Sequence, residues 1–251
     1  MVPGHGRPGW KTEIIPDRVR STVRVMEIER DTLVRKLFSQ KKEVDFFRSA
    51  STEEIFTHIY LTNKWGDEET RSGKGSRLDS TTKLRAALPD MLQQLDIKTM
   101  LDIPCGDFHW MKDVELPLAH YQGADIVKTL IEENRRRYGN EKREFLHMDL
   151  LKDPLPTVDA IFCRECLVHF SYTDTEKALQ NIKKSGSTYL FATHFPERRF
   201  NEDVVTGKHH SLNFNLPPFN WPTPITELTE CYAGKRRGNK CLSVWRIADL
   251  P

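Results

Sequence analysis

The chain has 251 residues, of which 38% are hydrophobic and 29% are charged, and its 38 basic residues nearly balance 36 acidic ones at a net charge of +2. This length fits one large domain with additions at its ends, and no apolar run approaches the roughly 18 residues that a membrane span requires. The Gly- and Pro-rich start, residues 1–10, has no apolar stretch typical of a signal peptide. We therefore expect a cytoplasmic protein with no membrane segment.

Residues 1–80 are predicted to form an N-terminal arm, helices and a cofactor lid. Within residues 17–48 the apolar positions recur near helical spacing, which predicts one long or two shorter amphipathic helices. These helices can pack on the core or pair with a second copy, so homo-oligomerisation stays open. Ser51-Thr52-Glu53-Glu54 is a capping box that begins a short helix. The polar, Gly-containing segment 63–76 that follows is long enough to be mobile or functional.

Residues 81–251 are predicted to form the core domain, entered by a helix with Asp79 or Ser80 as its N-cap. Strand-like runs then alternate with helices, and the clearest helices are expected at 128–138 and 173–184. The expected strands are 99–103, 120–126, 144–148, 158–163 and 188–193. Five strands in this rhythm predict a parallel sheet with right-handed crossovers.

The C-terminal part departs from this rhythm. Residues 225–232 and 240–247 are strand-like and are joined by a basic, Gly-containing turn, which is typical of an antiparallel hairpin. The predicted fold is therefore α/β and Rossmann-like. It has a seven-stranded sheet of five parallel strands closed by a C-terminal antiparallel hairpin, helices on both faces and an N-terminal helical extension.

The loop after the first strand, residues 102–107, is expected to lie in a cofactor cleft. In open α/β sheets the ligand binds beyond the carboxyl ends of the strands, where the strand order reverses. A dinucleotide fold would show Gly-x-Gly-x-x-Gly at this point, whereas this loop has only Gly106 between Asp102 and Asp107. Two carboxylates repel phosphate but suit a cofactor that carries an ammonium and a sulfonium group.

Acidic residues also end the next two strands. Asp125, at the end of the second strand, can accept both hydroxyls of a ribose. Met148 and Asp149 end the third strand, where a thioether can pack on a purine and a carboxylate can accept from its amino group. Three such residues in this order favour a nucleoside-containing cationic cofactor.

These features resemble the class I S-adenosylmethionine (SAM)-dependent methyltransferases over residues 99–195. Over most of 55–247 the chain resembles a small bacterial-type group with an Asp-x-Pro-Cys-Gly-Asp-Phe-x-Trp motif I. Its motifs are Asn-x-Trp-Gly and Ser-Gly-x-Gly-Ser, the Asp-x-Pro-Cys-Gly-Asp-Phe-x-Trp-Met loop, and Cys-Arg-x-x-Leu-Val-His. They stand here at 63–66, 72–76, 102–111 and 163–169.

The resemblance implies SAM as the cofactor, with Asp102 and Gly106 near its methionyl part, Asp125 on its ribose and Asp149 at its adenine. If residues 63–85 fold over the cofactor as a lid, Arg85 or Arg77 is expected to pair with the methionyl carboxylate. The full predicted cofactor set is Trp65, Ser76, Arg85, Asp102, Pro104, Cys105, Gly106, Asp125, Ile126, Met148, Asp149, Leu150, Cys163 and Arg164.

The methyl acceptor is expected to be a small molecule or a glycan that reacts at oxygen or nitrogen. Methyl transfer mainly requires alignment of the nucleophile, the methyl group and the sulfur, and a hydroxyl acceptor also needs a base, for which histidine is the usual choice. His169 and His194 follow the fourth and fifth strands and are the candidate catalytic residues. Residues 197–224, rich in aromatic, proline and amide side chains, are predicted to cap the acceptor pocket.

Two alternatives stay open, an RNA-binding methyltransferase and a catalytically silent SAM-binding scaffold. The first would use the basic triplets at 135–137 and 235–237, but no appended RNA-binding module or base-methylating motif supports nucleic-acid binding. A metal site is not expected. The Cys163–Cys166 pair has no second pair at ligand spacing, and a metal at His209, His210 and Asp203 would lack the several carboxylates that such a centre gathers.

Overall fold

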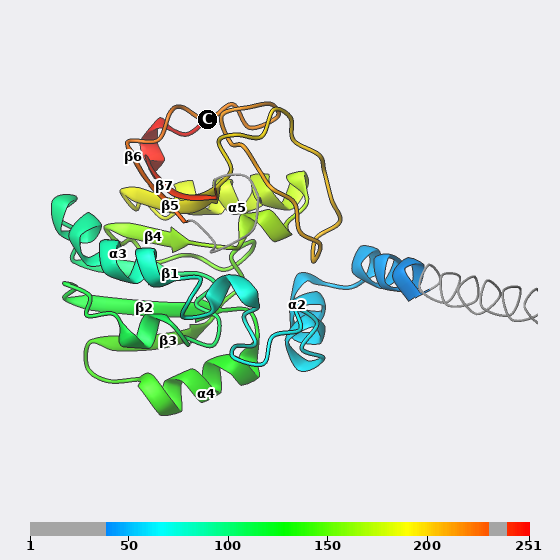
Figure 1. Cartoon of the computed structure of the whole chain (residues 1–251), viewed down its shortest axis with the longest axis horizontal. Coiled ribbons are helices and arrows are strands. Elements are labelled where there is room, and N and C mark those ends of the chain that lie inside the picture. Colours follow the sequence, from blue (N-terminus) through cyan, green and yellow to red (C-terminus); the bar gives the residue numbers. More distant parts are fainter. Residues whose placement is uncertain (1–38, 231–239) are drawn as a thin grey trace, which may run out of the picture. The chain divides into compact units, whose positions relative to one another are not determined.

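The structure, a computed structural model, describes residues 39–230 and 240–251 (Figure 1). The chain divides after Phe46 into two compact units, and the described part of the first, residues 39–46, is helical. Residues 47–80, which we expected to belong with the N-terminal extension, fall in the second unit. Most of the helices expected at 17–48, and the basic turn at 235–237, lie outside the described residues. The features below all belong to residues 47–251.

A seven-stranded sheet with the order β3-β2-β1-β4-β5-β7-β6 forms the centre of this unit. The strands β1 to β5 are parallel, and β7 runs antiparallel to both of its neighbours β5 and β6. The predicted fold class is therefore confirmed. The strands are β1 (Thr99–Asp102), β2 (His120–Asp125), β3 (Arg143–His147), β4 (Ala160–Cys163), β5 (Tyr189–His194), β6 (Thr226–Thr229) and β7 (Cys241–Arg246).

Helices cover both faces of the sheet, as the alternation along its strands requires (Figure 1). Met100 and Phe162 face a core that they share with α3 (Thr82–Gln94) and α4 (Lys128–Tyr138). Leu101 and Ile161 face the opposite core, which contains α5 (Tyr172–Lys184). The strand order reverses between β1 and β4, which makes the carboxyl ends of these two strands the switch point where ligands bind in such sheets.

The helix α2 (Thr52–Leu61) begins at the predicted capping box. The Glu54 N–H donates to Ser51 Oγ at 3.3 Å, and the Ser51 N–H donates to Glu54 Oε2 at 2.8 Å. The predicted N-cap of α3 is wrong, since that helix begins after Thr81. Ser80 Oγ donates to the Asp79 carboxylate at 3.0 Å. Both side chains are therefore engaged in a local turn, which competes with capping.

Residues 197–224, all of them described, connect β5 to β6 without a helix or strand. Their aromatic side chains Phe214, Phe219 and Trp221 are buried in the same core as α5. In the described ranges, no helix is long and apolar enough to cross a membrane.

Candidate active site

The loop after β1 is held against the sheet by its own peptide groups. The Ile103 N–H donates to Phe162 O at 2.9 Å and the Cys105 N–H donates to Ala124 O at 2.8 Å, so the loop continues the pairing with both neighbouring strands. Gly106 has a φ of +55°, a left-handed conformation that favours glycine. Its carbonyl accepts from the buried Asn134 Nδ2 at 2.7 Å. The position of this loop is therefore fixed before any ligand binds.

Two buried carboxylates stand at the ends of β1 and β2. Asp102 is 3% exposed, and burial raises its pKa to about 7 although the Tyr121 hydroxyl donates to its Oδ2 at 2.6 Å. Burial also raises the pKa of Asp125 to about 6, and the N–H groups of Val127 (3.0 Å) and Gly106 (3.2 Å) limit the rise. Burial disfavours the ionised form of these carboxyls, and a bound cation or hydroxyl donor would stabilise that form and so lower their pKa values.

The backbone just after β3 is hydrogen-bonded to the end of β2, since the Met148 N–H donates to Asp125 O at 3.0 Å. The Asp149 carboxylate accepts from the Leu151 N–H at 2.8 Å and pairs with Lys152 Nζ at 3.2 Å. It thus stabilises the turn after β3, and its two oxygens retain lone pairs for a ligand donor.

One cavity of about 630 Å³ opens over the carboxyl ends of β1, β2 and β4, and it brings most of the predicted cofactor residues together. The predicted residues that line it are Trp65, Ser76, Asp102, Pro104, Cys105, Gly106, Asp125, Ile126, Met148, Asp149, Leu150 and Arg164. Arg77, the alternative partner for a methionyl carboxylate, also lines it.

Arg85 and Cys163 do not line the cavity, so the structure does not support their predicted contact with a cofactor. Arg85 lies on α3, and its Nη2 donates to Leu78 O at 3.1 Å, which holds the preceding turn. Cys163 is fully buried, because it points from β4 into the core on the α5 side. Cys163 ends β4 and Arg85 lies in the first turn of α3, but neither side chain lines the cavity.

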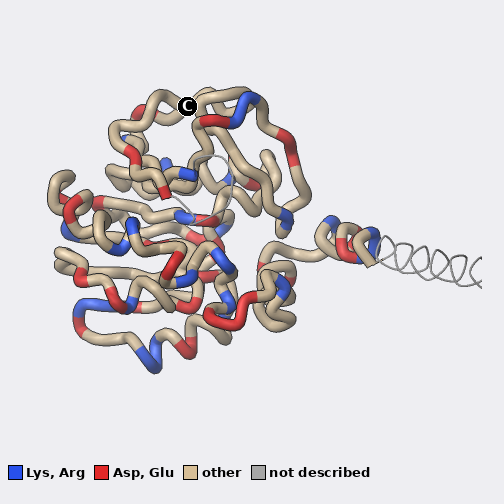
Figure 2. Tube along the Cα trace, in the orientation of Figure 1, with Lys and Arg blue, Asp and Glu red and all other residues tan. Residues whose placement is uncertain are grey.

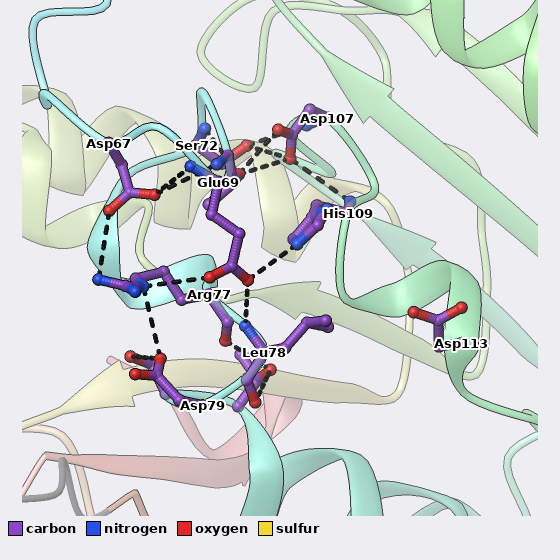
Figure 3. Close-up of polar contacts among 12 residues, drawn as sticks. Asp67, Glu69, Ser72, Arg77, Leu78, Asp79, Asp107, His109 and Asp113 are labelled. Carbon is purple, nitrogen blue, oxygen red and sulfur yellow. Dashed lines mark hydrogen bonds and ion pairs between the residues drawn. The ribbon is translucent and has the colours of Figure 1, made fainter.

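The segment 63–85, which we expected to form a lid, contains residues 67–80, which we call the strap. Residues 71–77 of the strap all line the cavity, together with Trp65 just before it. Asp107, which we expected to offset a cofactor's positive charge, does not line the cavity. Its carboxylate instead accepts from Thr70 and Ser72 of the strap (Figure 3).

A buried ion network forms part of the cavity wall. Arg164 pairs with Glu230 at 2.5 Å, and Lys240 pairs with Glu230 at 3.1 Å and with Glu165. Burial alone would raise the pKa of Glu165, but the Lys240 ammonium and the Arg164 guanidinium hold it well below its usual value. Arg164, Glu165 and Lys240 line the cavity. Of these, only Arg164 was predicted from the sequence, because Lys240 precedes its strand without a motif.

His169 lines the cavity, but His194 does not. The His169 ring lies 5.1 Å from the Trp65 ring and 5.3 Å from the His209 ring. Burial, with a smaller contribution from His209, lowers the pKa of His169 to about 4, so it is neutral at pH 7. The Gly207 N–H donates to His169 O at 2.8 Å, and the His210 N–H donates to Val168 O at 2.9 Å. These two hydrogen bonds bring residues 207–210 beside His169.

His194 is part of a buried aromatic cluster instead. Its Nδ1 accepts from the Phe214 N–H at 3.2 Å, and its ring contacts Phe214 and Trp245. Phe214 in turn stacks on Trp221 with ring centroids 4.1 Å apart. The segment 197–224 therefore contributes His209 and Ser211 to the cavity wall, whereas the aromatic side chains that we expected around the acceptor fill the core.

The structure gives no support to the RNA-binding alternative over the residues that it describes. Arg136 and Arg137 on α4 pair with Glu133, and Arg135 donates to Phe145 O at 2.8 Å. None of the three lines the cavity. Basic and acidic residues are interspersed along the described trace (Figure 2), whereas nucleic-acid binding requires a broad basic face.

Two of the side chains that were considered and set aside as metal ligands are hydrogen-bonded to the backbone. Asp203 accepts from the Tyr172 N–H at 2.8 Å, and His210 Nδ1 lies 2.7 Å from Glu202 O. Cys163 and Cys166 are buried free thiols, and no group of three or more metal-ligating side chains occurs within residues 39–230 and 240–251.

Comparisons with known proteins agree with this architecture. The methyltransferase domain family matches residues 100–185, from β1 to the end of α5. Magnesium protoporphyrin IX methyltransferase from Synechocystis PCC 6803, solved with bound SAM, is 12% identical with a TM-score of 0.52, over 79% of this chain and 98% of that one. An N-methyltransferase from Bradyrhizobium japonicum WM9 is 14% identical with a TM-score of 0.50, over 68% and 98%.

A third solved structure is similar to the same extent. The 1,6-didemethyltoxoflavin-N1-methyltransferase from Burkholderia thailandensis is 14% identical with a TM-score of 0.52, over 77% of this chain and 86% of that one. No curated protein matches the sequence significantly. At these identities the solved structures establish the fold, and the family match establishes the domain that it carries. Residues 100–185 are therefore a methyltransferase domain, and the chain has the fold of these solved methyltransferases.

Proposed function

We propose that this methyltransferase binds SAM over Asp102, Asp125 and Asp149 and transfers its methyl group to oxygen or nitrogen of a small-molecule acceptor. The observation that carries the proposal is that one cavity of about 630 Å³ has both kinds of wall. Strand-end carboxylates line it, and so do aromatic and imidazole side chains. Cavities of roughly 300–1,000 Å³ are typical of cofactor and small-molecule sites.

Asp125 is suited to hold the ribose. Its carboxylate is buried and already accepts from two backbone N–H groups, which fix its orientation. Two carboxylate oxygens can accept from both hydroxyls of a vicinal diol. Such donors stabilise the ionised form, and they would therefore lower the raised pKa of Asp125.

The adenine and methionyl ends follow from the neighbours of Asp125. Ile126, Met148 and Leu150 offer apolar and thioether surface for a purine, and Asp149 offers an acceptor for its amino group. Asp102, buried at the end of β1, is placed to face an ammonium group. The strap supplies Ser76 and Arg77 for the methionyl carboxylate, in place of Arg85.

The motifs that carry the resemblance to the small bacterial-type group support assignment to it. All of them contribute to one cavity although they are spread over more than a hundred positions. Trp65 comes from the first motif and residues 72–76 from the second. The loop after β1 supplies Asp102 and Gly106, and the last motif supplies Arg164 and His169.

The acceptor end is lined by Trp65, His169, Phe195 and His209. Aromatic faces suit a planar or ring-shaped molecule, including the end of a short glycan. Glu165 and Lys240 of the buried ion network also line the cavity. A cavity of about 630 Å³ has the size that is typical of small-molecule sites, which favours a small acceptor over RNA.

The cofactor supplies an activated methyl group, and the residues of the chain bind, orient and exclude water around it. The acceptor's lone pair forms the new bond to carbon as the carbon–sulfur bond breaks, and the acceptor's proton leaves. His169 is neutral at pH 7 because burial lowers its pKa to about 4. Its imidazole can therefore accept a hydrogen bond from the acceptor and take up that proton.

The cofactor proposal is tested by calorimetry with S-adenosylhomocysteine (SAH) on the wild-type protein and on Asp125→Asn. We expect binding by the wild type and a loss of about tenfold or more in the variant, since a hydrogen bond to a charged group is removed. A matched control is Asp113→Asn, because Asp113 is exposed, pairs with its neighbour Lys112 and does not line the cavity. Equal affinities for all three proteins would contradict the assignment of Asp125.

The acceptor class is tested with SAM carrying a radiolabelled methyl group in a cell extract. Label in the acid-soluble fraction supports a small acceptor, and label in the acid-insoluble fraction of nucleic acid and protein contradicts it. No transfer by a protein that binds SAH would favour the silent scaffold. With the acceptor in hand, His169→Gln is expected to lower kcat by about 10²-fold or more, whereas His120→Gln, at the opposite edge of the sheet, serves as the control.

A further inference from the structure

The Asp107 carboxylate is saturated by the strap rather than aimed at the cavity. Thr70 Oγ1 lies 2.9 and 2.7 Å from its two oxygens, the Arg71 N–H donates to Oδ2 at 2.9 Å and Ser72 Oγ donates to Oδ1 at 2.9 Å. The Asp107 N–H donates back to Ser72 Oγ at 2.9 Å. Three consecutive strap residues thus converge on one side chain of the loop after β1 (Figure 3).

A second carboxylate ties the strap to itself and to the same loop. Glu69 accepts from the Leu78 N–H at 2.7 Å and from Arg77 Nε at 3.2 Å, and it lies 3.0 Å from His109 Nε2 (Figure 3). On the other side of the cavity, Arg164 Nη2 donates to Gly75 O at 2.8 Å. The strap is therefore fastened both to the loop after β1 and to the loop after β4, which flank the switch point.

Polar contacts are almost all that holds the strap in place. Its buried residues are Asp67, Thr70, Gly73 and Ser76, and its only large apolar side chain, Leu78, is partly buried. Segments with few buried apolar contacts open at a low free energy compared with the core. Residues 71–77 line the cavity, so an opening of the strap would uncover the site.

We propose that Asp107 is a positioning residue that latches the strap over the bound cofactor and thereby sets the rate at which SAM and SAH exchange. The inference rests on the proposed cofactor site, but Asp107 acts through Thr70, Arg71 and Ser72 and not by contact with the cofactor. A hydrogen bond to a charged group changes an equilibrium constant by about ten- to a hundredfold. Loss of the charge at Asp107 is expected to accelerate release of SAH by a factor in this range.

The test compares Asp107→Asn with Asp113→Asn. Asp113 is a carboxylate six residues further along, and it lies apart from the strap in Figure 3, so its change removes the same charge without touching the latch. SAH release is followed by stopped-flow tryptophan fluorescence, since Trp65 and Trp110 line the cavity. We expect release to accelerate about tenfold or more in Asp107→Asn and to stay at the wild-type rate in Asp113→Asn. Unchanged release in Asp107→Asn would overturn the latch.

Hydrogen exchange separates the latch from the cofactor proposal, because it needs no ligand. In the protein without ligand, the Arg71 amide is expected to exchange faster in Asp107→Asn, with the amides of β1 unchanged. If the wild type binds no SAH, the cofactor proposal fails while this exchange result still reports on the latch. If Asp107→Asn does not fold, Ser72→Ala removes the same contact from the strap side, and it should give faster exchange at Arg71. Wild-type exchange in Ser72→Ala would contradict the latch.

Discussion

Replacement of Gly106 by alanine tests whether the loop after β1 and the strap must approach each other closely. Gly106 has a φ of +55°, and a Cβ built there would lie 2.3 Å from Ser72 Oγ and 3.1 Å from Ser72 Cβ. The left-handed conformation costs an alanine about 1–2 kcal/mol. Ordinary contact begins near 3.4 Å, so Ser72 must also retreat by about 1 Å.

That retreat stretches both hydrogen bonds between Ser72 and Asp107, each of which is 2.9 Å long. One of them involves a carboxylate, and such bonds contribute about 1.5–3 kcal/mol. If the closed strap is the form that binds the cofactor, the SAH dissociation constant is expected to rise about ten- to a hundredfold. Calorimetry measures this constant, and urea unfolding of the protein without ligand measures the change in stability.

Gly186→Ala is the matched control. Gly186 has a φ of +69° in the connection between α5 and β5, and the nearest atom to an added Cβ, Thr157 Oγ1, is at an ordinary 3.9 Å. It should lose a similar 1–2 kcal/mol of stability and keep the wild-type SAH affinity. The reasoning is refuted if Gly106→Ala binds SAH as tightly as the wild type, or if Gly186→Ala weakens binding equally.

The other predictions concern the electrostatics of the cavity and the residues that do not line it. The pKa values of about 7 for Asp102 and about 6 for Asp125 lie above those of the unfolded chain, so these two carboxyls lower the stability of the protein without ligand as pH rises from about 4 to 7. A ligand that favours their ionised form should bind more tightly as pH rises from 5 to 7, by up to about tenfold per pH unit for each carboxyl that is below its pKa, and a flat calorimetric profile would contradict this. Phe214→Ala should lower the unfolding free energy by about 3–5 kcal/mol because it empties a stacked, fully buried site, and it should leave SAH affinity unchanged in calorimetry. Arg85→Ala should also leave the SAH dissociation constant unchanged, since Arg85 holds Leu78 O outside the cavity, and a clear loss would return it to the site.

The sheet and most helices could be predicted because their signals are local. The helix α4 has the predicted bounds, and the capping box at Ser51 forms as expected. That Asp125 and Met148 lie near each other could be predicted for the same reason, since the carboxyl ends of parallel strands meet at one edge, and both line the cavity. The start of α3 was wrong because Asp79 and Ser80 bond to nearby groups instead of capping the helix.

The role of Asp107 could not be predicted, because its partners lie 35 or more positions earlier in the chain. An acidic residue beside a glycine at a strand end has the same local pattern whether it faces a ligand or a protein segment. The same limit applies to Lys240, which reaches Glu165 across 75 positions. Only the folded arrangement shows which carboxylates are already paired within the protein and which remain to face a ligand.

The two histidines show how the position of a strand in the sheet decides what its end can do. Both lie toward the carboxyl ends of strands that point to the same edge, yet β4 borders the switch point next to β1, whereas β5 borders the antiparallel strand β7. His194 still belongs to β5 and is paired with Cys241 in the sheet. Residues of the 197–224 segment cover it, and Phe214 stacks on its ring. His169 lies six residues beyond β4, past the turn at Glu165, and so it reaches the cavity. If this protein uses a histidine base, we therefore expect it after β4 rather than at the end of β5, where the pairing with β7 buries the strand end in the core.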